Sequence, residues 1–145
     1  MIPEKLWHYT AAKRLKEIVE SREIRLTDKL IAKSEKPAVW VSSNPIWEFT
    51  ATKMAKNNSG LIKQLTKEEM YKLFGLGRIE IVPNEKYISW AKFKHKSRIP
   101  ADYFFELERA GIDKGANPKD WFARFTSIPI EEWIAIETWN GTAWS

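Results

Sequence analysis

Tryptophan is the feature of this sequence that most restricts the folds open to it. The 145 residues include eight tryptophans. They are Trp7, Trp40, Trp47, Trp90, Trp121, Trp133, Trp139 and Trp144. An indole ring buries a large apolar area and keeps one N–H donor, and several of these rings alternate with aliphatic residues as strand residues do. We therefore expect most of them in a strand-containing core; lining a groove for flat rings is their second possible use.

The order of the expected elements indicates the fold class. Strand-like runs occupy residues 6–9, 23–26, 38–42, 78–82, 87–93 and 133–139. Helical spacing or capping signals mark residues 11–20, 46–56, 66–74 and 100–110. The strand–helix alternation that a parallel sheet needs breaks after Gly77. The pattern predicts an α+β fold, with a mixed, mostly antiparallel sheet and helices packed on it, over a single domain of residues 1–145.

Composition excludes several classes of function. Cysteine is absent, which rules out disulfides, thiolate zinc sites and a cysteine nucleophile, and suits a reducing cytosol. No apolar run reaches about 18 residues, and the N-terminus lacks a signal-peptide pattern. The net charge of +5 permits a polyanionic partner, or serves solubility alone. We expect a cytoplasmic protein without a membrane partner, of a size that suits a bacterial or phage accessory protein.

Polar residues at two strand ends are the first candidates for a site. His8 ends the first expected strand beside Tyr9 and Thr10, and side chains at strand ends are often binding groups. Ser42 and Ser43 end a later strand, where hydroxyls could hold a phosphate or a ribose. The alternatives are a histidine satisfied by backbone groups and serines that only help to cap a helix.

Four glutamates are acidic candidates for a site. Glu131 and Glu132 come before the last expected strand, with Glu132 at its entrance. Glu137 shares a face of that strand with Trp133, because side chains alternate with a period of two. Glu48, close to Ser43, is a weaker candidate. Any of these acids could equally be a solvated surface charge.

Residues 86–98 interleave aromatic rings with cations. The rings are Tyr87, Trp90 and Phe93, and the cations include Lys92, Lys94, Lys96 and Arg98. This composition is typical of a nucleic-acid surface, where rings stack on bases and cations meet phosphates. A half-buried strand that runs into a basic loop has the same composition. His95 lies among three of these lysines and far from the other histidine, so no metal site is predicted.

The start of the chain resembles a known family. The run Leu6-Trp7-His8-Tyr9-Thr10, the following helix with Leu15 and Ile18, and residues 23–26 resemble the opening of small ADP-ribosyltransferase-like domains. RNA 2′-phosphotransferases and DNA-modifying bacterial toxins belong to this group. The resemblance covers about residues 6–43 and, more loosely, the last strand.

The resemblance implies a split sheet of the ADP-ribosyltransferase-like fold. It also implies NAD-dependent ADP-ribosyl transfer to a macromolecular target, protein or nucleic acid, with NAD as the cofactor and no metal. The NAD-binding positions that it implies are His8, Tyr9, Thr10, Trp40, Ser42 and Ser43. The implied catalytic carboxylate is Glu132, or Glu137 in its place. The alternative is a catalytically inactive binding module for nucleic acid or protein on the same fold. Its nucleic-acid surface would use Trp90, Lys92, Lys94, Lys96 and Arg98.

Overall fold

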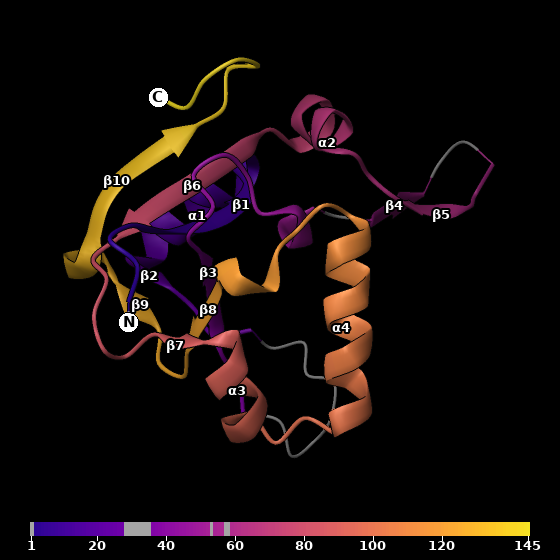
Figure 1. Ribbon diagram of the computed structural model, residues 1–145. Coiled ribbons are helices and arrows are strands. Elements are labelled where there is room, and N and C mark those ends of the chain that lie inside the picture. Colours follow the sequence, from indigo (N-terminus) through magenta and orange to yellow (C-terminus); the bar gives the residue numbers. More distant parts are fainter. Residues whose placement is uncertain (1, 28–35, 53, 57–58) are drawn as a thin grey trace.

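The computed structural model describes residues 2–27, 36–52, 54–56 and 59–145. A six-stranded sheet in the order β10-β6-β1-β3-β8-β7 forms its centre (Figure 1). The strands are β1 (Leu6–Ala11), β3 (Val39–Ser42), β6 (Leu76–Ile81), β7 (Ile88–Ser89), β8 (Trp121–Arg124) and β10 (Trp133–Thr138). Neighbouring strands are antiparallel throughout this sheet. The expected α+β class with a mostly antiparallel sheet is therefore confirmed.

Helices and two small strand pairs surround the sheet. The helices are α1 (Ala12–Ser21), α2 (Lys67–Phe74), α3 (Trp90–Lys96) and α4 (Ala101–Asp113). Short 3-10 turns are η1 (Phe49–Ala51), η2 (Pro118–Asp120) and η3 (Ile130–Glu132). The small pairs join β2 (Glu23–Ile24) to β9 (Ile128–Pro129), and β4 (Met54–Lys56) to β5 (Ile62–Gln64). Within the described ranges, no helix has the length and apolar character needed to cross a bilayer.

The sheet is weakly joined between β1 and β3. β1 pairs with β6 at six registered positions, from Leu6 to Ala11. It pairs with β3 at a single registered position, Trp7 opposite Ser42. The β1–β3 seam therefore lacks a continuous ladder, and side chains from both strands can enter it.

Burial of the tryptophans agrees with the expectation from sequence. Trp7, Trp47, Trp90 and Trp121 are buried, and the other four rings are partly buried. Buried apolar residues form clusters on both faces of the sheet, because alternate residues of β1 point to opposite sides. Leu6 packs with Leu15 of α1 on one face, and Trp7 packs with Trp47 on the other.

Local capping signals correctly predicted α2. The Thr66 hydroxyl accepts a hydrogen bond from the Glu69 amide, and the Glu69 carboxylate accepts one from the Thr66 amide. This reciprocal capping box satisfies two amides that the first helical turn leaves without partners. The helix then ends at Gly75, whose positive φ of 71° favours glycine.

Two expected elements are wrong. The helix expected over residues 46–56 is replaced by η1 and strand β4. Asn44 accepts a bond from the Ile46 amide, but the backbone is extended at Glu48 (φ −101°, ψ 107°), whose side chain turns inward to partners on β3 and β8. The strand expected over 87–93 is limited to Ile88–Ser89, and α3 begins at Trp90. Burying Trp90 and Phe93, three residues apart, suits one face of a helix and not one face of a strand.

The expected helix over 100–110 is confirmed but continues beyond its expected stop. Gly111 lies within α4, which ends at Asp113. A Cβ atom at Gly111 would stand 2.6 Å from the Trp121 ring. Glycine is therefore present to let α4 approach this ring closely, and not to end the helix.

Candidate functional site

An aromatic hollow of about 360 Å³ lies at the β1–β3 seam. Its aromatic lining is Trp7, Tyr9, Trp40, Trp90 and Trp121, and its polar lining includes His8, Ser42, Glu48 and Thr50. These residues come from β1, β3, β8, α3 and the η1 region, so segments far apart in the sequence together line the hollow. A site of this kind, apolar with a few polar groups, is the usual form of a small-ligand pocket.

Glu48 is the carboxylate of the aromatic hollow, and only 8% of it is exposed. Its Oε1 accepts a hydrogen bond from Ser42 Oγ at 2.9 Å. Its Oε2 accepts bonds from Trp121 Nε1 at 3.1 Å, the Thr50 amide at 3.1 Å and the Thr50 hydroxyl at 2.7 Å. All four donors are neutral. They fix the carboxylate without neutralising its charge, and Oε1, which accepts one of the four bonds, can accept another.

His8 enters the seam and binds the backbone of β3. Its Nδ1 lies 2.8 Å from the Trp40 carbonyl oxygen. A carbonyl only accepts, so Nδ1 carries the proton and Nε2 is left as an acceptor in the neutral ring. Burial lowers the pKa of His8 below 6.5; the bond to Trp40 opposes this shift, and the Arg14 charge adds to it. The ring is therefore neutral at pH 7.

Other expected binding residues have separate places. The Tyr9 hydroxyl donates to the Asn44 carbonyl and accepts from Arg78 Nη1 at 3.3 Å, while burial raises its pKa to about 12. Tyr9 thus holds the chain that leads to Glu48, although its ring lines the hollow. The Ser43 hydroxyl donates to Asp120 at 3.0 Å and does not line the hollow.

A second, more polar hollow of about 710 Å³ adjoins the first. It shares His8, Thr27 and Trp40 with the aromatic hollow. Its lining includes Thr10, the cations Arg14 and Arg25 and the carboxylates Glu17 and Glu23. Arg25 Nε lies 3.4 Å from Glu23 Oε1, so these two side chains form an ion pair. His8 and Thr27 are therefore the polar side chains that the aromatic hollow shares with a second compartment of mixed charge.

The two carboxylates that the resemblance implied lie outside both hollows. Glu132 accepts from Arg124 Nη1 at 2.8 Å, and this bond holds the pKa of Glu132 below 4.5. Glu137 accepts from Arg78 Nε at 2.8 Å. The structure therefore brings His8 together with Ser42 and Glu48, and not with Glu132 or Glu137. The sequence signal for Glu48 was only its closeness to the strand end at Ser42.

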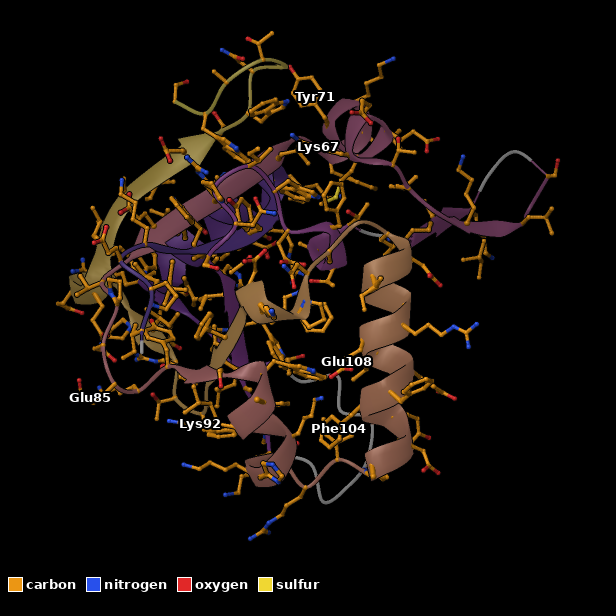
Figure 2. The ribbon with its side chains drawn as sticks, in the orientation of Figure 1. Lys67, Tyr71, Glu85, Lys92, Phe104 and Glu108 are labelled. Carbon is orange, nitrogen blue, oxygen red and sulfur yellow. The ribbon has the colours of Figure 1, made fainter. Side chains whose placement is uncertain are left out.

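Helix α3 separates the rings and cations that the sequence interleaves. Tyr87, Trp90 and Phe93 are buried, and the Trp90 indole N–H donates to Glu108 of α4. Lys94 also pairs with Glu108. Figure 2 shows Glu108 on the side of α4 that faces α3, whereas Lys92 points away from α4. The rings are therefore part of the core and unavailable for stacking on bases at the surface.

Comparison with other proteins adds no relative. Neither a model of a protein family, nor a curated protein, nor a solved structure matches this chain. Within the described part of the chain, no group of three or more His, Asp or Glu side chains is arranged to hold a metal ion. Functional inference therefore depends on the geometry of the two hollows.

Proposed function

We propose that this protein transfers ADP-ribose from NAD⁺ to a macromolecular target on an ADP-ribosyltransferase-like split sheet, with the aromatic hollow as the site of the nicotinamide–ribose end. The observation that carries the proposal is Glu48, a buried carboxylate whose donors in the described part of the chain are all neutral and which shares its hollow with four indole rings. In this version of the site, Glu48 takes the role that the family resemblance gave to Glu132 or Glu137.

The aromatic hollow suits a flat cation. The pyridinium ring of NAD⁺ is planar and positively charged, so it is attracted to indole faces and to a carboxylate that no cation among the described residues neutralises. The hollow, at about 360 Å³, is at the small end of the ligand-pocket range, so it fits one end of a dinucleotide and not the whole. The ligand must therefore extend into a second compartment.

The polar hollow supplies that compartment. Arg25 pairs with Glu23 at 3.4 Å, so Arg14 is the guanidinium that we assign to the phosphate oxygens, which such groups bind strongly. His8 lies between the compartments, where its neutral Nε2 can accept a hydrogen bond from a ribose hydroxyl. A ligand with an aromatic cation, a ribose and a pyrophosphate matches this order of groups.

The proposed reaction places positive charge near Glu48. The bond between ribose C1′ and the nicotinamide nitrogen breaks, and nicotinamide leaves with the electron pair as a neutral molecule. The ribosyl group then carries oxocarbenium-like charge until a target oxygen or nitrogen forms a bond to C1′ and loses its proton. A fixed carboxylate stabilises the developing cation and lowers the barrier. Donors from Ser42, Thr50 and Trp121 hold Glu48 in place, so little reorganisation is required.

Two measurements test the proposal: quenching of tryptophan fluorescence by NAD⁺, and release of nicotinamide with water as the acceptor. We expect quenching at millimolar NAD⁺ and a fall in nicotinamide release of about 100-fold in Glu48→Gln. Glu131→Gln, which removes an exposed carboxylate, is the matched control and should behave as wild type. Absence of quenching in the folded wild-type protein, or equal release by the two variants, would contradict the proposal.

A further inference from the structure

A basic surface at the end of α3 is the strongest feature that the proposed chemistry does not use. Residues 86–98 contain Lys86, Lys92, Lys94, Lys96 and Arg98 and no acidic residue. Lys94 is paired with Glu108 of α4, so its charge is already partly neutralised. Lys92, His95 and Lys96 are exposed and lie at i, i+3 and i+4, the spacing that places side chains on one face of a helix.

Tertiary structure adds a cation from elsewhere in the chain. The backbone amide of Lys36 donates to the carbonyl of Ser97 at 2.9 Å, which fixes Lys36 at the C-terminal end of α3. Lys36 and Arg98 are both exposed. We call this group of five side chains the α3 basic surface: Lys36, Lys92, His95, Lys96 and Arg98. Two segments about 60 residues apart in sequence therefore concentrate positive charge on one area.

The composition of this surface favours nucleic acid over an acidic protein. Protein–protein interfaces have an apolar core and are depleted in lysine. Among residues 91–98, Ala91 is the only exposed apolar side chain, because Phe93 is buried. Interfaces with nucleic acid are polar and strongly positive, and most of their hydrogen bonds go to phosphate and sugar.

We propose that the α3 basic surface binds the phosphate backbone of nucleic acid, without stacking of bases. Backbone contacts carry no sequence information, so binding is independent of sequence and strongly dependent on salt. Trp90 and Ile99, which flank the surface in sequence, line the aromatic hollow, so the same segment of chain contributes to both. We therefore infer that nucleic acid is the target of the transferase reaction; this assignment rests on the proposed function, whereas the binding itself does not.

Binding can be measured without NAD⁺, which separates this proposal from the transferase proposal. We would use fluorescence anisotropy with a labelled mixed-sequence single-stranded RNA and a duplex DNA of equal length over a range of salt concentrations. The variant Lys92→Glu/Lys96→Glu should bind about tenfold more weakly or worse, and its plot of log K against log salt should be less steep by about 2. Lys5→Glu/Lys16→Glu makes the same change in net charge at two exposed lysines elsewhere and should bind as wild type.

Three results would overturn the proposal. The first is no anisotropy change at low salt with the folded wild-type protein. The second is equal weakening in the two double variants, which would indicate a general effect of net charge. The third is displacement of the RNA by polyglutamate at matched charge concentration, which would assign the surface to an acidic protein. Circular dichroism of each variant shows whether the fold is retained.

Discussion

Glu48 and Glu132 are both carboxylates with several hydrogen-bond donors, but the donors differ in charge. Ser42, Thr50 and Trp121 bind Glu48 through neutral groups. Glu132 accepts from the buried guanidinium of Arg124 and from the amide of Asn84. Both acids are fixed in position, yet only Glu48 is fixed without a described cation against it.

This difference indicates which acid can act on a ligand. An ion pair with Arg124 neutralises most of the field of Glu132, so that carboxylate stabilises the fold. A carboxylate oriented by neutral donors keeps its field and can stabilise a cationic ligand or transition state. Substituting Glu132 and Glu48 separately tests whether the first carboxylate stabilises the fold and the second acts on a ligand.

The largest expected effect is on stability. Glu132→Gln leaves the Arg124 guanidinium buried without its counter-ion, so the free energy of unfolding should fall by about 2–3 kcal/mol. The pKa of Glu132 is lowered in the folded state, so its contribution is present above pH 4.5 and is lost as pH falls through the lowered pKa. Urea unfolding at pH 7 and at lower pH measures both effects. A loss no larger than that of Glu131→Gln would show that the pair contributes nothing.

The next largest effect is on the preference for a cationic ligand over a neutral one. The nicotinamide ring is cationic in NAD⁺ and neutral in NADH, so Glu48 should favour NAD⁺ by about tenfold, or about 1.4 kcal/mol. Glu48→Gln should reduce this ratio to near one, whereas Glu132→Gln should keep it. Fluorescence titrations with both nucleotides give the ratio. Similar ratios in the two variants would remove the distinction between the acids.

A smaller effect is expected from the donor on β8. Trp121→Phe removes the Nε1–H that binds Glu48 Oε2 and should cost about 1 kcal/mol of unfolding free energy. Trp133→Phe removes a comparable bond, to the Ile128 carbonyl at 3.2 Å, away from Glu48. The two variants should have similar stability, but only Trp121→Phe should weaken NAD⁺ binding. Weakened binding in both would mean that Trp121 does not act through Glu48.

The smallest expected effect is the titration of His8. Its pKa is lowered in the folded protein, so the unfolded chain binds a proton first as pH falls below 6.5. The free energy of unfolding should decrease between pH 6.5 and pH 5, with a slope below about 1.4 kcal/mol per pH unit. His8→Gln should remove this dependence and His95→Gln should keep it. An unchanged profile in His8→Gln would show that this imidazole does not titrate in that range.

Local signals explain which elements could be predicted. The capping box at Thr66 and Glu69 and the apolar alternation in residues 133–138 depend on neighbours a few residues away, and both elements form as expected. The prediction for residues 46–56 was wrong because their conformation depends on a distant partner. Glu48 binds Trp121, 73 residues away. For residues 87–93, the signals that could have revealed α3 were Ser89 as a cap and the three-residue spacing of Trp90 and Phe93.

The sequence by itself determined the α+β class, which follows from the periodicity of its apolar residues, and the burial of the tryptophans, which follows from the size of their rings. It also identified His8 as a candidate binding residue from its position at a strand end. Only the tertiary structure decided which glutamate joins His8. A carboxylate can neutralise a cation or face a ligand, and the choice depends on whether folding brings a guanidinium or neutral donors to it. Arg124 reaches Glu132, whereas Ser42 and Trp121 reach Glu48.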